Sequence, residues 1–520
     1  MRGTAAAALR GESRLLGRFA ANALSILSSE VVIRATNFVV YALIARRLGA
    51  FAFGQLALAL SLFYVFQILA TAGQRTLMIR DIARDPASTS RQLRSACAVV
   101  TLASALAFVP LAALIAVFGW ERETVITILA VFVGLLPYAL SQTCEGAMQG
   151  LEQMRFIAYA NVPLHVAKAV VVAVMIYAGA GVVAVALALA GVYWLVLAAD
   201  VVLVRRRLIE PAAGRVTYGA LGPDPVGSRI RERARRGSSF LGVDTVFAVG
   251  SVTPVLVVSA LLGEVAVGVL GAAQQAVMPL SLAINSLVAV AYPAMCRTFE
   301  LTAERTRLVV VTLVEALLMV VLPFIISISV FSALVVDILY PNKEFDGSAD
   351  LLRLIVWWSV ANLVASVMGV ALWALNRERT SMVIGLWSTL VSLVTTVVFV
   401  ELVGLNGVAI GMACVTVVIL VQHYRALASS VTPRELLFGM WRPAVAGAAQ
   451  AGFVVPLATM VSGLIAQIAL AVAGVAVYGL ALVVLNRARA RNPVTGQRRQ
   501  LPLAVLIQNL GSPAEPAERR

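Results

Sequence analysis

The chain has 520 residues, of which 61% are hydrophobic and only 13% are charged, and its mean hydropathy is +0.92. Soluble globular domains carry about a quarter charged residues, so this composition excludes a soluble protein and indicates an integral membrane protein. The net charge of +15 does not indicate a nucleic-acid partner, because the arginines are spread over loops beside apolar stretches and do not gather on a soluble module.

Long apolar stretches recur along the chain, and each can cross about 30 Å of hydrocarbon as a helix. Their unbroken length excludes the alternating strands of a β-barrel, so we predict an all-α polytopic fold with about 14 transmembrane helices. The predicted spans are residues 19–44, 51–73, 95–118, 124–147, 156–178, 181–204, 238–262, 265–293, 308–338, 354–375, 381–403, 406–424, 443–463 and 465–486. Pro323 predicts a kink in the ninth span.

The basic residues predict the orientation of these spans. With the N-terminus inside, the cytoplasmic segments hold 34 of the 41 Lys and Arg residues, the outer connections hold five, and Arg34 and Lys168 lie within spans. The positive-inside rule therefore predicts an N-in, C-in topology. The densest basic cluster, RIRERARRG at residues 229–237, is interpreted as a topology anchor in preference to a binding surface for membrane lipids.

An internal repeat divides the predicted spans. At an offset of 214 residues, LGAFAFGQL at 48–56 aligns with LGEVAVGVL at 262–270 with five identities in nine positions, and Glu30 aligns with Asp244. A similar offset aligns GVVAVA at 181 with GVAIGM at 407. Duplication of a six-helix unit predicts two lobes of equal orientation with a substrate site between them at mid-depth, as in alternating-access transporters.

The repeat and the basic segments together predict the organisation of the chain. We expect two pseudo-symmetric six-helix lobes, a basic linker between them and two appended helices. The predicted parts are a cytoplasmic segment at 1–18, an N-lobe at 19–204, the linker at 205–237, a C-lobe at 238–424, the appended pair at 443–486 and a disordered cytoplasmic tail at 487–520.

Several motifs resemble one family, the polysaccharide-transporter (Wzx-type) branch of the multidrug/oligosaccharidyl-lipid/polysaccharide exporter superfamily. The motifs are ARRLGAFAFGQL at 45–56, SALLGEVAVGVLGAAQQ at 259–275, AYPAM at 291–295, LNRER at 375–379 and GLNGVAIG at 404–411. The resemblance implies a flippase in the cytoplasmic (inner) membrane of a bacterium. Its implied substrate is an undecaprenyl-pyrophosphate-linked oligosaccharide, with proton or sodium coupling and other polysaccharide-assembly proteins as candidate partners.

Polar residues inside the first span form one helical face: Glu30, Arg34, Asn37 and Tyr41 recur at steps of three and four residues. Arg34 lies too deep to reach the inner surface and needs an internal partner. A guanidinium group binds phosphate oxygens in a bidentate manner, which suits a pyrophosphate. An ion pair with Glu30 that only stabilises the helix is an equally open interpretation.

The fifth span carries a second polar face with Asn161, His165 and Lys168. We predict that Arg34, Lys168, Asn37 and Asn161 line a central cavity and bind the pyrophosphate. The candidates for ion coupling are Glu30, Asp244, Glu145 and His165. For Glu145 and His165, contact with interfacial water or with a neighbouring helix is the favoured alternative.

No catalytic, cofactor or metal site is predicted. The chain has no P-loop, HExxH or GxSxG motif, and Cys97, Cys144, Cys296 and Cys414 lack the spacing of metal ligands. A lipid II flippase and a multidrug/cation antiporter of the same superfamily are the alternative functions. A membrane-embedded glycan polymerase or ligase is disfavoured because no outer loop is large enough for a catalytic domain.

Overall fold

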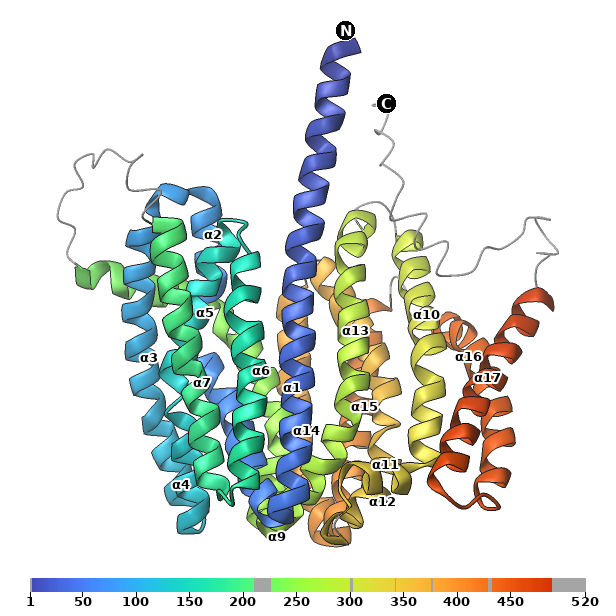
Figure 1. Cartoon of the computed structure of the whole chain (residues 1–520). Coiled ribbons are helices and arrows are strands. Elements are labelled where there is room, and N and C mark those ends of the chain that lie inside the picture. Colours follow the sequence, from blue (N-terminus) through green and yellow to red (C-terminus); the bar gives the residue numbers. More distant parts are fainter. Residues whose placement is uncertain are drawn as a thin grey trace. The chain divides into compact units, whose positions relative to one another are not determined.

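The computed structural model is built of helices throughout the residues that it describes, which are 2–209, 226–299, 303–341, 343–375, 377–428 and 433–488 (Figure 1). The side chains of 2–28, of 289–308 and of parts of 207–244 lie outside the described residues. The structure also does not describe residues 489–520 of the predicted tail, residues 210–225 at the centre of the linker, or the side chain of Cys296. The predicted all-α fold is confirmed for the described part.

Contacts between residues divide the chain into two compact units, Met1–Gly268 and Val269–Arg520. The predicted seventh span, 238–262, therefore groups by contact with the first six spans, whereas the repeat assigns it to the second lobe. The division into an N-lobe at 19–204 and a C-lobe at 238–424 stays a prediction.

In its described residues, the first unit contains seven α-helices and the first part of an eighth. They are α1 (Arg2–Thr71), α2 (Gln74–Arg84), α3 (Thr89–Phe118), α4 (Arg122–Phe132), α5 (Leu135–Gly150), α6 (Arg155–Tyr177), α7 (Val182–Leu203) and the first part of α9 (Val226–Phe299). Helix α6 packs on α1 and α7, and α5 packs on α2, α3 and α7. Asn161, His165 and Lys168 are buried residues of α6, so its polar face points into this bundle and away from lipid.

The described part of the second unit begins with the rest of α9, from Val269, and continues with eight further α-helices. They are α10 (Ala303–Val330), α11 (Ser332–Leu339), α12 (Gly347–Ile355), α13 (Trp358–Ala374), α14 (Glu378–Val403), α15 (Gly407–Leu427), α16 (Pro433–Ala458) and α17 (Leu464–Ala488). The predicted ninth span is interrupted at Phe331, between α10 and α11, whereas α10 continues through Pro323. The side chain of Ser327 donates a hydrogen bond to the carbonyl oxygen of Pro323 at 2.8 Å, and so does Gln450 on α16 at 3.0 Å.

Two glycines break the longest helices at equivalent positions of the repeat. Gly49 interrupts α1 with φ 83° and ψ 178°, and Gly263 interrupts α9 with φ 80° and ψ −178°. Side chains disfavour such positive φ values, so glycine is the residue suited to both reversals. In Figure 1 the chain turns back at the lower end of α1. The predicted repeat therefore has a matching backbone conformation at its best-aligned motif.

The two halves of this motif also contact each other. A Cβ atom added at Gly54 would lie 1.8 Å from the carbonyl oxygen of Glu264, and one added at Gly268 would lie 2.1 Å from that of Ala50. Ala50 and Glu264 are equivalent in the repeat, and so are Gly54 and Gly268. The contact is therefore reciprocal, and it needs glycine on both sides because backbone meets backbone.

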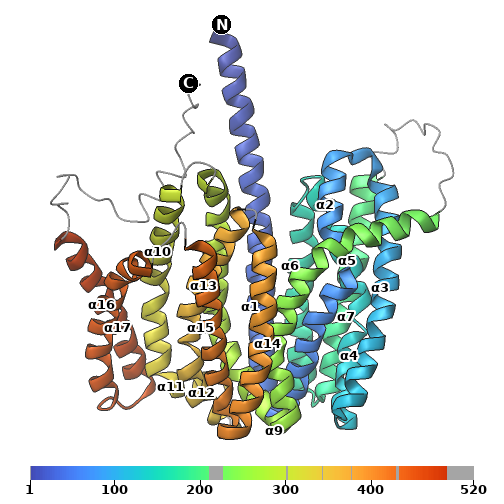
Figure 2. The ribbon, with the colours of Figure 1, turned by 180° about the vertical axis from the view of Figure 1, so that it is seen from behind.

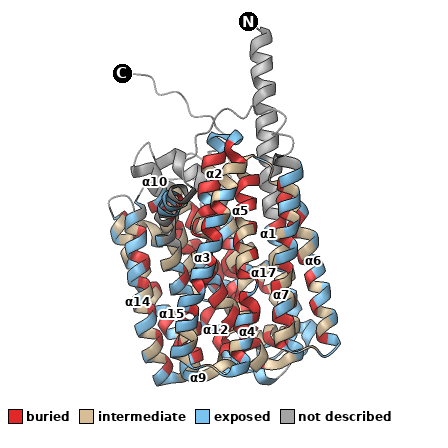
Figure 3. Cartoon of the chain, turned by 90° about the vertical axis from the view of Figure 1, so that its left-hand side faces the viewer, coloured by how far each residue is buried: buried red, intermediate tan, exposed pale blue. Residues whose placement is uncertain are grey.

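Among the described residues, nine helical segments are long and apolar enough to cross a membrane, or ten if the bent pair α12 and α13 counts as one span. Three of these segments have 56, 44 and 49 residues, and they contain Gly49, Gly263 and Gly404 respectively, each with a positive φ value. Many large apolar residues are exposed, and exposed positions, in pale blue, recur along the helices in Figure 3. The chain is a polytopic membrane protein, and the count of 14 spans stays a prediction.

Candidate functional site

The polar faces of α1 and α6 meet in the first unit. The ammonium group of Lys168 donates a hydrogen bond to Oδ1 of Asn37 and lies 2.9 Å from Nδ1 of His165. Lys168 is only 6% exposed, and both of its partners are neutral amide or imidazole groups. Asn37 belongs to the polar face predicted for the first span, and His165 and Lys168 belong to the one predicted for the fifth span. The three residues form one cluster.

Lys168 has no carboxylate partner among the described residues. Removing an ammonium group from water costs several kcal/mol, and only an opposite charge compensates that cost well. Asn37 and His165 supply hydrogen bonds without charge. The cluster is therefore suited to an incoming anion.

Arg34 lies one turn before Asn37 on α1 and forms the predicted ion pair with Glu30. Its Nε atom is 3.1 Å from Oε2 of Glu30, and the two side chains are 39% and 50% exposed. The two terminal nitrogens of the guanidinium group make no hydrogen bond to the described residues. Exposed charges within an apolar span are costly against lipid, so this face of α1 is suited to a hydrated cavity.

The remaining predicted polar residues form a second cluster between α5 and α6. The amide of Asn161 donates to Oε1 of Glu145 at 2.8 Å, and Nη2 of Arg75 lies 3.6 Å from the other oxygen of Glu145. Arg75 also donates to Gln142 at 2.6 Å. Asn161 thus binds a predicted coupling residue, whereas the described partners of Lys168 are Asn37 and His165.

Two features of the site were not predicted from the sequence, and one predicted residue has no described side chain. Arg75 was assigned to a cytoplasmic loop, although it reaches the buried Glu145. Asp200 was not singled out, although an acid inside the predicted sixth span was a signal that could have identified it. Asp244 lies in α9, but its side chain is outside the described residues, so its proposed equivalence with Glu30 has no structural description.

The described part of the basic cluster packs on α2 and α3 within the first unit. Arg233 is 4% exposed and donates to the side chains of Gln74 at 2.7 Å and of Gln92. Arg236 forms an ion pair with Asp81 at 2.7 Å. Figure 2 shows the first part of α9 beside α2. Part of this segment therefore anchors helices to one another, in addition to any role in topology.

Replacing Arg233 by Gln should release the segment 231–237 from α2, because the guanidinium group bridges two helices and glutamine is too short to do so. We expect faster hydrogen exchange of the backbone amides over 231–237 in the purified protein. Arg231→Gln, at an exposed position of the same segment, is the matched control. Equal exchange in both variants would mean that Arg233 does not hold the segment.

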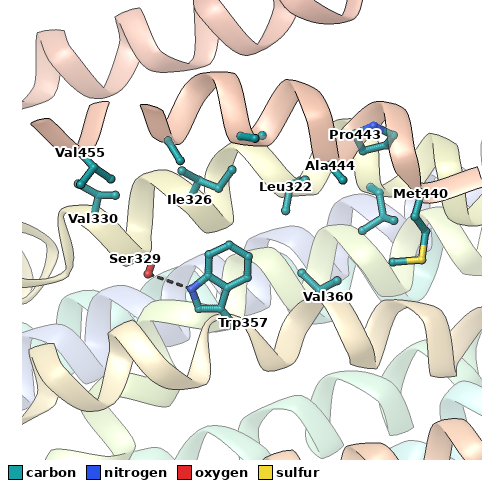
Figure 4. A pocket seen from close by; sticks show the side chains of 14 residues that line it. Leu322, Ile326, Ser329, Val330, Trp357, Val360, Met440, Pro443, Ala444 and Val455 are labelled. Carbon is teal, nitrogen blue, oxygen red and sulfur yellow. Dashed lines mark hydrogen bonds between the residues drawn. The ribbon is translucent and has the colours of Figure 1, made fainter. Parts of the chain in front are cut away.

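An apolar groove of about 480 Å³ lies in the second unit between α10, α13 and α16 (Figure 4). Its walls include Leu322, Ile326, Trp357, Val360, Ala444 and Val455. The only polar contact drawn in this view is the hydrogen bond from the indole of Trp357 to Ser329 at 3.0 Å. Such a groove suits hydrocarbon and not sugar.

Deeper polar contacts in this unit are structural. Arg442 forms an ion pair with Glu315 at 3.1 Å, with side chains 10% and 13% exposed, and so joins α16 to α10. The hydroxyl group of Tyr478 on α17 donates to the carbonyl oxygen of Leu318. Removing one partner of a buried ion pair costs about 3–5 kcal/mol of folding stability. This structural role is sufficient to explain why Arg442 and Glu315 are present.

Comparison with known proteins identifies a family and a fold. Residues 19–299 match the family described as Polysaccharide biosynthesis protein. No curated protein matches the chain.

Among similar solved structures, the lipid II flippase MurJ in an inward closed conformation has 12% sequence identity and a TM-score of 0.68, over 90% of this chain and 99% of that one. An inward-facing multidrug resistance MATE family transporter of the MOP superfamily has 16% identity and a TM-score of 0.63, over 79% and 95%. The eukaryotic MATE transporter AtDTX14 has 16% identity and a TM-score of 0.54, over 83% and 99%. At these identities the likeness shows the fold, which is that of the MOP-superfamily transporters.

Proposed function

Because the chain belongs to the Polysaccharide biosynthesis protein family, we propose that it is a flippase for a lipid-linked oligosaccharide in the cytoplasmic membrane of a bacterium. The proposed substrate carries an undecaprenyl-pyrophosphate type of anchor, and the product of its transport is used to build a cell-surface polysaccharide. This substrate is the one that the motif resemblance implies. The family membership and the flippase and transporter fold support a membrane transporter more generally.

One observation carries the choice of substrate: the buried ammonium group of Lys168 has only neutral partners in the described part of the chain. A diphosphate would supply the missing negative charge. The terminal guanidinium nitrogens of Arg34 on the neighbouring helix, which make no hydrogen bond to the described residues, suit phosphate oxygens. A site for cationic drugs would instead be centred on unpaired acids. Of the predicted coupling acids whose side chains the structure describes, Glu30 and Glu145 both have basic partners. The buried Asp200 has no basic partner among the described residues, but it makes no hydrogen bond to the Lys168 cluster.

We propose that the inward-open protein binds the pyrophosphate at Lys168 and Arg34 while the sugars occupy the hydrated cavity and the lipid tail stays in an apolar environment. Rearrangement of the two predicted lobes would then expose the headgroup on the outer side. Glu30, Asp244, Glu145 and His165 remain the candidates for ion coupling from the sequence analysis.

A binding experiment distinguishes this proposal from the drug antiporter. Undecaprenyl pyrophosphate should raise the unfolding temperature of the detergent-purified protein, because a ligand that binds the folded state stabilises it by mass action. A lipophilic cation at the same concentration should not. Stabilisation by the cation alone would contradict the proposal and favour the antiporter, and equal stabilisation by undecaprenol would show that the diphosphate is not recognised.

A further inference from the structure

Asp200 is a buried acid that the proposed substrate site does not use. It lies on α7 with a side chain that is 0% exposed. One carboxyl oxygen, Oδ2, lies 2.5 Å from the hydroxyl oxygen of Ser141 on α5, and the other, Oδ1, has no hydrogen-bond partner. A single hydroxyl group cannot replace the several water molecules that a carboxylate binds.

The titratable groups around Asp200 supply no positive partner. In the described part of the chain, the titratable groups that interact with Asp200 are Cys144 and Glu145 on α5. The titratable residues on the other helices that pack on α7 include Glu30 and Tyr41 on α1 and His165 and Lys168 on α6, and Arg205 and Arg206 follow in the helical turn after α7. Lys168 is bonded to Asn37 and His165, and Arg205 and Arg206 are exposed. Glu145, the acid that interacts with Asp200, adds negative charge. An ionised Asp200 would therefore be an unpaired charge beside a second acid.

Apolar and aromatic side chains close both ends of this site. Tyr193 precedes Asp200 by seven residues and Val204 follows it by four, so all three lie on one face of α7. The ring of Tyr193 stacks on Phe63, with ring centroids 5.6 Å apart. Towards the end of α7, Val204 belongs to a buried cluster with Cys144, Met148, Phe156 and Ile157. Asp200 is therefore closed off from solvent in this packing of α5 and α7.

We propose that Asp200 and Ser141 form an occluded proton-binding site, which holds one proton while α5 and α7 are packed and releases it when they separate. In the packed state the neutral carboxylic acid keeps the hydrogen bond with Ser141 and avoids a buried charge. Ionisation favours a state in which water enters between the helices. The site therefore links proton release to a movement of α7, and this goes beyond the ion-coupling residues considered above.

Infrared spectroscopy of the purified protein tests proton binding without a substrate. At neutral pH the wild-type protein should show the C=O stretching band of a neutral carboxylic acid, and Asp200→Asn should abolish that band. Ser141→Ala should shift the band, because it removes the one hydrogen bond. Asp350→Asn, at an exposed acid of α12, is the matched control and should leave the band unchanged. Absence of the band in folded wild-type protein, or its persistence in Asp200→Asn, would overturn the proposal.

A second experiment tests the link to transport and rests on the proposed function. In proteoliposomes, the rate of flipping of a lipid-linked oligosaccharide should change with pH in the wild type, and this dependence should be lost in Asp200→Asn. An unchanged pH profile in that variant would overturn the link to the transport cycle. Failure of the wild type to flip the substrate at any pH would contradict the proposed function and leave the infrared result as an independent test.

Discussion

Replacing Lys168 by Met is expected to lower the initial rate of lipid-linked oligosaccharide flipping by about ten- to a hundredfold, since a hydrogen bond to a charged group contributes about 1.5–3 kcal/mol. Methionine keeps most of the side-chain volume, so the packing of α6 on α1 should survive. Arg34→Gln should have an effect of the same order, because glutamine cannot bind phosphate oxygens as a fork. The rates are measured in proteoliposomes that contain equal amounts of folded protein.

The controls separate binding of an anion from structural support. Lys168→Arg keeps the positive charge and should retain more activity than Lys168→Met. Lys343→Met, at the other lysine of the chain and an exposed position, should leave the rate unchanged. If Lys168→Met and Arg34→Gln both flip the substrate at the wild-type rate, these residues do not bind the pyrophosphate.

The second large effect is expected at the reciprocal glycine contact. Gly54→Ala and Gly268→Ala each place a Cβ atom within 2.1 Å of a carbonyl oxygen of the opposing segment, so the backbones must move apart. Overpacking of this kind costs about 1–3 kcal/mol or more, and each variant should show an unfolding temperature lower by several degrees. Differential scanning fluorimetry in detergent measures the change.

The two substitutions act on one contact, so their effects should not add. The first alanine already separates the segments, and the double variant should lose less stability than the sum of the single variants. Gly191→Ala on α7 is the matched control, because a Cβ atom added there meets nothing within 4 Å. If Gly54→Ala were as stable as Gly191→Ala, the close contact would have no energetic importance.

The sequence predicted the fold well because its strongest signals are local or repeated. Apolar length predicted the helices, and the aligned motifs at 48–56 and 262–270 predicted equivalent turns, which Gly49 and Gly263 confirm. The contact of Gly54 with Glu264 could not be predicted from the sequence, because the periodicity of a helix does not indicate which helix packs against it. The interruption of the ninth predicted span at Phe331 was not predicted either, and α10 continues through Pro323.

The candidate site was predicted only in part for the same reason. Helical spacing predicted that Glu30 and Arg34 share a face, and the ion pair between them is present. Spacing could not predict that Lys168 binds Asn37 across 131 positions of the chain, or that Asn161 binds Glu145. Asp200 was missed because it stands alone on its helix, and its importance arises from the neighbouring α5.

The most direct test of the proposed function measures flipping by the purified protein in proteoliposomes. A fluorescent undecaprenyl-pyrophosphate-linked oligosaccharide is placed in both leaflets, and its exposure is followed with a membrane-impermeant quencher. Protein-containing vesicles should expose the inner-leaflet lipid far faster than protein-free vesicles or vesicles with the Arg34→Gln/Lys168→Met double variant. Equal rates in all three preparations, with transport of a lipophilic cation by the wild type, would contradict the assignment as a lipid-linked oligosaccharide flippase.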